Sequence, residues 1–351
     1  MFEGLGMFVM KAIPLHLGHV HAINLAATQC EDLCVVLCYS KHDNDYFNSM
    51  RLDPIPYKQR YKWLLEIYQD IPHVHILTHC EDGIPDYPNG WKEWSNSIKL
   101  LFKKYGRFPN KWFSSEICDK ENAEKFFTET EFILIDPERK ETPISGTKIR
   151  KDGIYKYWEF LPGVVRPFFA KRVVLIGTES TGKSTLTKLL AKKFNTSWTD
   201  EYGREFIKKF CFGHESLLAF GDYAKIAQRH KMYEEEALRS ANKVTFIDTE
   251  AMVTQLYCHM YENKVNRVVD AIAKTQKYDM WLFLRPDVPW VPDGMRQHEH
   301  SREIQMKQLI DICGYYGLQK DIDLKFISGN YHKRMLSAIK HVNDLLSEGN
   351  V

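Results

Sequence analysis

Residues 177–184 read GTESTGKS and have the spacing of a phosphate-binding loop. In such a loop the glycines let backbone N–H groups curl around an anion, the lysine reaches the β- and γ-phosphates, and the final hydroxyl ligates Mg²⁺. A strand-like run precedes the loop, and a helical pattern begins near Lys183, as the mechanism requires. The pattern predicts ATP binding by Gly177, Gly182, Lys183, Ser184 and Thr185, with Lys183 also acting in catalysis.

Acidic residues further along the chain suit the other parts of a phosphoryl-transfer site. Asp248 ends a hydrophobic run, where a carboxylate can hold Mg²⁺ together with Ser184 or orient the nucleophile. Glu201 lies about 20 residues past the loop, in the segment that faces the acceptor in small-molecule kinases. Either Glu201 or Asp248 can accept the proton of the acceptor hydroxyl, and the sequence leaves that choice open. The predicted acceptor contacts are Glu201, Tyr202, Arg204 and Asp248.

Two arginines follow the strand-like run Met280–Leu284. Arg296 and Arg302 suit a mobile lid that closes over the transferring phosphoryl group and binds ATP. A solvated charged loop is the competing interpretation.

A second anion site is indicated near the amino terminus. His16 and His19 flank Gly18 at a predicted strand-to-helix turn, which brings two imidazoles and a helix N-terminus to one place. Histidines there can donate to oxygens on which charge accumulates during an in-line displacement. A structural histidine pair is the alternative.

The motif ISGTKIR at residues 144–150 strengthens that interpretation, because two hydroxyls and a guanidinium stand at a predicted helix start. The two motifs together look like the nucleotidyltransferase superfamily. They predict a site that binds ATP through His16, Gly18, His19, Ser145, Thr147 and Arg150, with both histidines catalytic.

Between these motifs, the turn YPNGW at residues 87–91 presents aromatic residues near a helix start. The indole of Trp91 can stack on a flat cationic ring, with Tyr87 and Asn89 beside it. The competing interpretation is that Trp91 and Trp94 are core aromatics. The segments Phe113–Glu116 and Asp136–Arg139 end strand-like runs, where open α/β sheets bind ligands, so we expect base and ribose contacts there.

Alternating strands and helices must position these motifs, and the pattern predicts an α/β fold with two doubly wound parallel sheets. Two prolines and a glycine in 161–167 mark a boundary, giving domains at 1–162 and 168–351. The first half carries strand-like runs at Phe8–Ala12, Leu33–Tyr39, Val74–Thr78, Trp112–Ser115 and Phe132–Ile135, with helical patterns at His19–Ala27, Tyr57–Tyr68, Trp91–Lys104 and Asn122–Phe127. The alternation restarts at Arg172–Ile176 and continues through Val244–Ile247, Met280–Leu284 and Leu324–Ile327.

Composition bounds the class of protein. The 351 residues carry a net charge of +2, which argues against a general nucleic-acid-binding surface. No apolar run approaches the length of a membrane span, and the first ten residues do not resemble a signal peptide. The eight cysteines lack a C-x-x-C pair, so we expect reduced thiols and a cytoplasmic location. The sequence leaves open whether the chain forms a homo-oligomer.

The ordered motifs, from His16–His19 through YPNGW, FSSE, DPER, ISGTKIR, GTESTGKST, EYGREF and IDTE, resemble the NadR-type bifunctional enzymes. The resemblance runs from about residue 8 to at least residue 305 and implies a Rossmann-like nicotinamide-mononucleotide (NMN) adenylyltransferase followed by a P-loop ribosylnicotinamide kinase. The helix-turn-helix repressor domain of many members is expected to be absent. This chain has Met10-Lys11-Ala12 where the family usually has Gly-x-Phe, so we expect an altered backbone approach to the phosphates.

The resemblance implies two reactions in NAD biosynthesis and salvage. ATP and Mg²⁺ would phosphorylate nicotinamide riboside, and a second ATP would adenylylate the resulting NMN to give NAD and pyrophosphate. Tyr87, Asn89 and Trp91 would then bind NMN, and Glu201, Tyr202, Arg204 and Asp248 would bind nicotinamide riboside. The alternatives are a fusion acting on another nucleoside, a DNA-binding regulator that senses NAD, and a sensor with one inactive domain.

Overall fold

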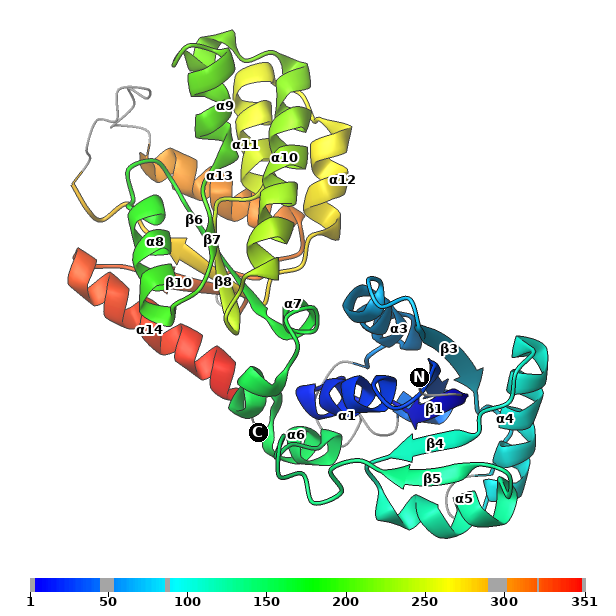
Figure 1. The fold of residues 1–351 in the computed structure, drawn as a ribbon. Helices are drawn as coiled ribbons and strands as arrows, with labels where there is room; N and C mark the ends of the chain where they lie inside the picture. Colours follow the sequence, from blue (N-terminus) through cyan, green and yellow to red (C-terminus); the bar gives the residue numbers. More distant parts are fainter. Residues whose placement is uncertain (1–3, 45–53, 86–88, 290–301, 321, 349–351) are drawn as a thin grey trace. The chain divides into compact units, whose positions relative to one another are not determined.

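The computed structural model describes residues 4–44, 54–85, 89–289, 302–320 and 322–348. Its contacts divide the chain into two compact units, Met1–Val165 and Arg166–Glu348 (Figure 1). This division falls within the segment 161–167.

The first unit is a five-stranded parallel sheet with the order β3-β2-β1-β4-β5. Its strands are β1 (Leu5–Met10), β2 (Asp32–Tyr39), β3 (Val74–Cys80), β4 (Lys111–Ser114) and β5 (Glu131–Leu134). Its helices are α1 (Leu17–Ala27), α3 (Tyr57–Tyr68), α4 (Trp91–Tyr105), α5 (Lys120–Phe126) and α6 (Gly146–Asp152), with short 3-10 helices η1 (Lys41–Asn44), η2 (Ile117–Asp119) and η3 (Ile154–Phe160).

The second unit repeats the architecture with the parallel order β10-β9-β6-β8-β7. Its strands are β6 (Lys171–Gly177), β7 (Trp198–Thr199), β8 (Val244–Asp248), β9 (Met280–Leu284) and β10 (Leu324–Ile327). Its helices are α7 (Arg166–Phe169), α8 (Lys183–Phe194), α9 (Tyr202–Phe210), α10 (Phe220–Arg239), α11 (Ala251–Glu262), α12 (Arg267–Thr275), α13 (Arg302–Tyr315) and α14 (Tyr331–Glu348), with the 3-10 helix η4 (Glu215–Leu217).

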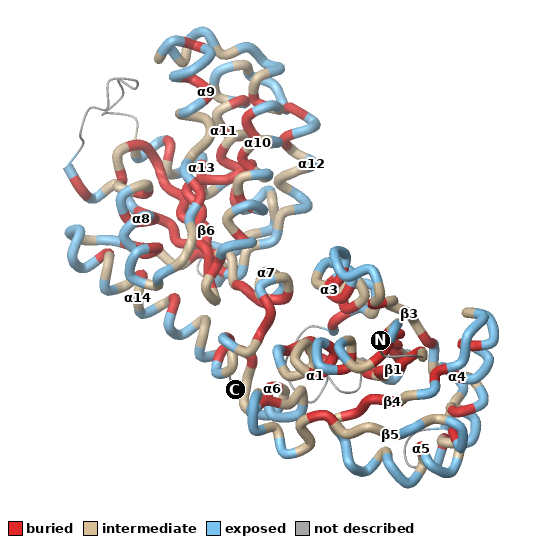
Figure 2. The backbone as a smooth tube through the Cα atoms, viewed as in Figure 1, coloured by how far each residue is buried: buried red, intermediate tan, exposed pale blue. Residues whose placement is uncertain are grey.

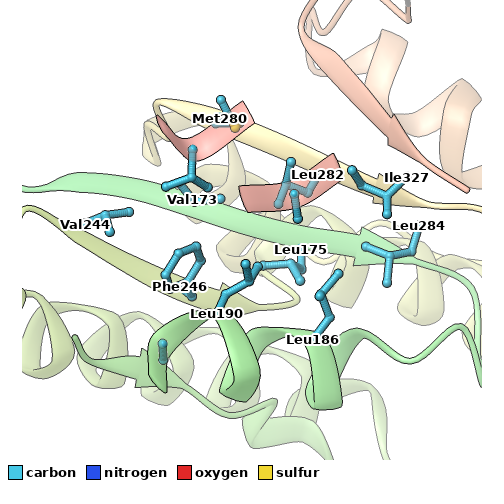
Figure 3. Packing of buried hydrophobic residues seen from close by; sticks show 13 residues of the cluster. Val173, Leu175, Leu186, Leu190, Val244, Phe246, Met280, Leu282, Leu284 and Ile327 are labelled. Atoms are coloured by element: carbon cyan, nitrogen blue, oxygen red, sulfur yellow. The ribbon is translucent and has the colours of Figure 1, made fainter. Parts of the chain in front are cut away.

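Both sheets are buried on two faces, which explains why their central strands are continuous apolar runs. In the first unit, Ile98 and Phe102 of α4 pack against alternate residues of β1 and β2. In the second unit, Leu186 and Leu190 of α8 meet the apolar side chains of β6, β8 and β9 (Figure 3). The buried backbone follows the strands, while the outer faces of the helices are exposed (Figure 2).

The fold class predicted from the sequence, two doubly wound parallel sheets, is confirmed, but the bounds of β1 were wrong. This strand begins at Leu5 and ends at Met10, two residues before the predicted end. Ala12 takes a positive φ of 54°, which a continuing strand does not allow. The chain therefore turns before His16.

All eight cysteines are free thiols; Cys80 and Cys118 are exposed and the other six are buried. Within the described residues, every helix is too short or too polar to cross a membrane.

Candidate active sites

His16 is the N-cap of α1 and His19 lies in its first turn, and residues 11–15 connect them to the carboxyl end of β1. Their rings are stacked with centroids 3.7 Å apart, and His16 is 1% exposed. Both ring nitrogens of His16 and Nδ1 of His19 are buried without a hydrogen-bond partner among the described residues. Because native proteins rarely leave such groups unsatisfied, these nitrogens indicate a ligand site.

Burial keeps both imidazoles neutral. It is the first cause that lowers the pKa of His16 far below its ordinary value, followed by the nearby charge of His19 and of Arg139 and Arg150. Burial and the same two arginines lower the pKa of His19 to about 3. At neutral pH the pair therefore acts through hydrogen bonds and not as a fixed positive charge.

Gly18 is required for this arrangement. A Cβ at position 18 would lie 3.0 Å from the ring of His16 and 3.3 Å from Cγ2 of Ile144, the first residue of ISGTKIR. The absence of a side chain therefore lets the two sequence motifs pack against each other.

Ser145, Thr147 and Arg150 of ISGTKIR stabilise the start of α6 and connect it to the segment before His16. Ser145 Oγ accepts the backbone N–H of Lys148 and caps α6. Arg150 Nη1 donates to the carbonyl of Ile13 (2.6 Å), and Nη2 donates to Thr147 Oγ1 (3.0 Å). Arg150 thus fixes α6 to the segment that leads into His16.

A cavity of about 220 Å³ opens over the histidines. His16, Gly18 and His19 line it, together with strand-end residues from the segments that were expected to contact base and ribose. Ser145, Thr147 and Arg150 are not among its described lining residues. The strand-end residues are Ser114, Ser115, Glu116, Asp136 and Arg139.

Lys11 also lines this cavity, although no motif in the sequence indicated a role for it. Its ammonium lies 3.1 Å from Asp43 Oδ1 and 2.9 Å from Glu81 Oε2. Burial acts to lower its pKa, but the carboxylates of Glu81 and Asp43 outweigh burial and raise it. Lys11 is therefore a fixed cation beside neutral histidines.

Arg60 holds the backbone of the same segment. It is almost fully buried, and its Nη1 donates to the Lys11 carbonyl (2.5 Å) while Nη2 donates to Asp43 (2.6 Å). Met10, the departure from the family pattern, is 7% exposed and lines the cavity next to Lys11.

Of the residues predicted to bind NMN, Asn89 and Trp91 are not among the described lining residues of this cavity. Asn89 is exposed, and Trp91 packs edge-on against Trp94 with centroids 5.4 Å apart. Trp91 is partly buried and packs against the aromatic part of the core. Tyr87 lies outside the described residues.

The loop between β6 and α8 has the backbone that its glycines predict. Gly177 has a φ of 156°, and a Cβ there would lie 2.7 Å from the carbonyl oxygen of Leu284. Gly182 takes a left-handed φ of 83° and is the N-cap of α8. Lys183 is buried, and its Nζ donates to the carbonyls of Gly177 and Thr178, each at 2.9 Å. Ser184 is half-buried, and Thr185 is exposed.

Asp248 ends β8, next to β6, and is 1% exposed. Burial and then the negative charge of Glu201 raise the pKa of its carboxyl, and the net value is about 6 because Lys183 and a hydrogen bond from Ser184 act in the opposite direction. Asp248 Oδ2 is buried without a hydrogen-bond partner among the described residues. A hydroxyl and an unsatisfied carboxylate oxygen side by side fit a hard divalent cation that keeps several waters.

Glu201 lines a small hollow of about 40 Å³ and accepts from Arg204 Nε at 2.8 Å. The ring of Tyr202 packs edge-on against Tyr233. Arg302 begins α13 and donates to the carbonyl of Val288 at 3.0 Å. Arg296 lies outside the described residues.

His230 on α10 is a site residue that the sequence analysis missed. Its Nδ1 accepts the backbone N–H of Tyr202 (3.3 Å), so its Nε2 carries the proton and donates to the carbonyl of Thr249 (3.1 Å). Burial lowers its pKa to about 4. His230 therefore joins the segment of Glu201 to the segment of Asp248 as a neutral ring.

Three comparisons bear on what these sites do. A family model described as an AAA domain matches residues 172–315. The chain is 34% identical over 354 residues to the trifunctional NAD biosynthesis/regulator protein NadR of Salmonella typhimurium (strain LT2), covering 99% of this chain and 84% of that relative.

Two solved structures share the fold over nearly the whole chain. A NadR protein in complex with NR has a TM-score of 0.81 at 23% identity and covers 98% of this chain and 97% of that one. A NadR protein in complex with NAD and AMP-PNP has a TM-score of 0.77 at 24% identity and covers 99% of this chain and 97% of that one.

Proposed function

The chain belongs to the NadR family of NAD-biosynthesis proteins, and from that membership we propose that it makes NAD from nicotinamide riboside in two steps. The second unit transfers the γ-phosphoryl group of ATP to the ribose 5′-hydroxyl, which gives NMN. The first unit joins the phosphate of NMN to the α-phosphorus of a second ATP and releases pyrophosphate. The domains 1–162 and 168–351 carry the two activities.

In the kinase step, backbone N–H groups of residues 177–184 cradle the phosphates and Lys183 neutralises charge on the transferring group. Ser184 and Asp248 hold Mg²⁺, and Thr185 and the arginines at 296 and 302 complete the ATP site. The negative charge of Glu201 raises the pKa of Asp248, which supports a single site served by both carboxylates. Glu201, Tyr202, Arg204 and Asp248 face the riboside, and a carboxylate takes the proton of the attacking hydroxyl.

In the adenylyltransferase step, His16 and His19 donate to the phosphate oxygens of ATP as charge builds on them, while Gly18 allows the close approach. Ser145, Thr147 and Arg150 bind the triphosphate, and Tyr87, Asn89 and Trp91 bind NMN. Lys11 and Arg139 add positive charge to the cavity. Both reactions run in line without a covalent enzyme intermediate, so positioning and charge stabilisation supply most of the acceleration.

We place both reactions in the cytoplasm, where the eight free thiols stay reduced and ATP is available. The proposal depends most on one observation: a single chain holds both a buried histidine pair with unsatisfied nitrogens and a phosphate loop beside an unsatisfied carboxylate.

One assay tests the proposal. Nicotinamide riboside, ATP and Mg²⁺ are supplied, and NMN and NAD are followed separately. Lys183→Ala should slow NMN formation by about 10²–10³-fold and leave NAD formation from added NMN intact, whereas His19→Ala should do the reverse. Lys188→Ala, on the same helix, and His73→Ala, outside the cavity, are the matched controls. Loss of both steps from either change in a folded chain contradicts the division of labour.

A further inference from the structure

A buried guanidinium lies behind the phosphate loop. Arg334 of α14 is 2% exposed. Its Nη1 donates to the carbonyl of Thr181 (2.6 Å), Nη2 donates to the carbonyl of Arg285 (2.6 Å) and to Asp287, and Nε donates to the carbonyl of Gly329 (2.8 Å). Arg334 therefore connects three chain segments: the phosphate loop, the residues that follow β9, and the turn before α14.

Such a group is stable in the interior only when all of its partners are in place. A buried charge is costly unless it is paired and hydrogen-bonded, and a partly satisfied one is worse than an apolar group. Asp287 supplies the countercharge and also accepts the backbone N–H of Gly329 at 2.6 Å. The energy of the cluster therefore depends on the position of the Thr181 carbonyl.

That carbonyl belongs to the part of the loop that must be oriented for anion binding. A phosphate is held by N–H groups, so a carbonyl turned toward it would repel it. Thr181 directly precedes Gly182, the left-handed N-cap of α8. Arg334 holds the oxygen on the side of β9 and α14.

Lys183 performs a related task for the start of the loop, where it donates to the carbonyls of Gly177 and Thr178. A lysine that reaches the β- and γ-phosphates has to give up contacts of this kind. Arg334 has no such second role, because its donors are directed to Thr181, Arg285, Asp287 and Gly329.

We propose that Arg334 is a positioning residue for the kinase step, which presets the phosphate loop for ATP by holding the Thr181 carbonyl away from the anion. The inference rests on the proposal that this loop binds ATP. Arg334 contacts neither substrate, so its loss should weaken ATP binding without altering the site of the riboside.

The test measures kcat and the KM of each substrate for the full chain. Arg334→Ala should raise the KM for ATP by about 10- to 100-fold, the effect of losing one charge-assisted hydrogen bond, and should leave the KM for nicotinamide riboside within about twofold. Arg334→Lys, which keeps the charge but reaches fewer acceptors, should fall between Arg334→Ala and the wild type. Lys340→Ala, an exposed change on α14, should match the wild type.

Each outcome of this experiment either supports or overturns the role proposed for Arg334. A normal KM for ATP in a folded Arg334→Ala chain, or equal rises for both substrates, overturns the proposal, as does a rise with Lys340→Ala. If Arg334→Ala does not fold, Arg334→Lys decides: a raised KM for ATP supports the proposal, and a normal one overturns it. If the wild type binds ATP but leaves the riboside unphosphorylated, the proposed function fails. The inference about Arg334 is then tested by calorimetric ATP binding to Arg334→Lys: a weaker affinity than that of the wild type supports it, and an equal affinity overturns it.

Discussion

Asp248 is a carboxylate at which burial and a neighbouring charge act in the same direction. Both raise its pKa, to about 6 from an ordinary value of 3.8. Because the folded-state pKa of this acid is raised, its contribution to stability is fully present below about pH 3.8 and is lost as the pH rises through 6. The second unit therefore bears an electrostatic cost at neutral pH that a bound cation would relieve.

The first prediction follows for Asp248→Asn, which keeps the shape and removes the charge. The variant should be more heat-stable than the wild type, and its advantage should be a few degrees larger at pH 8 than at pH 5. Its kinase activity should be lost. Thermal unfolding at the two pH values, with and without Mg²⁺ and ATP, measures this. A variant advantage that is the same at both pH values contradicts the raised pKa.

Some of the candidate site residues can be predicted from local sequence patterns, and others cannot. Lys183 and Asp248 stand in local patterns, so their position next to each other follows from the order of motifs and strands. His230 and Arg60 stand in ordinary helical patterns, and their partners lie 17 to 49 residues away. Nothing local distinguishes them from surface residues; only the packing of α10 and α3 shows that they are buried and what they hold.

Helix starts determine both sites. α1 begins after β1, and α8 begins after β6, so each sheet presents a helix N-terminus at the carboxyl end of a central strand. The alternation of apolar runs was sufficient to predict this arrangement. The sequence could not predict the early end of β1, because it depends on the backbone of a single residue, Ala12.

The second prediction concerns the start of α1. Gly18→Ala should cost about 1–3 kcal/mol of stability in the first unit, because its Cβ would press on the His16 ring and on Ile144. NAD formation from NMN should fall sharply, since the stacked histidines must move, while riboside phosphorylation stays normal. Gly163→Ala, whose Cβ would meet nothing within 4 Å, is the matched control. Normal NAD formation in Gly18→Ala would show that the close packing is not needed.

At the scale of the molecule, the site residues divide along the chain. Those proposed for adenylyl transfer lie before Val165, and those proposed for phosphoryl transfer lie after Arg166. The proposal therefore assigns each reaction to the side chains of one unit.

The third prediction is that two damaged chains complement each other. A mixture of Lys183→Ala and His19→Ala chains should convert nicotinamide riboside to NAD, because NMN made by one chain can diffuse to the other. Each variant alone should form NAD from the riboside far more slowly than the mixture does. Timed chromatography of the mixture would show NMN rising before NAD; a mixture that forms NMN but no NAD would mean that the intermediate cannot pass between molecules.

The distribution of exposed thiols allows one half of the molecule to be labelled selectively. The two exposed cysteines, Cys80 and Cys118, both belong to the first unit, and Cys80 directly precedes the Glu81 that pairs with Lys11. A maleimide dye applied to the native protein will therefore attach to the amino-terminal half alone. With Cys118 replaced by serine, a single fluorophore would stand beside that ion pair, so nucleotide occupancy of one half could be read out without interference from the other.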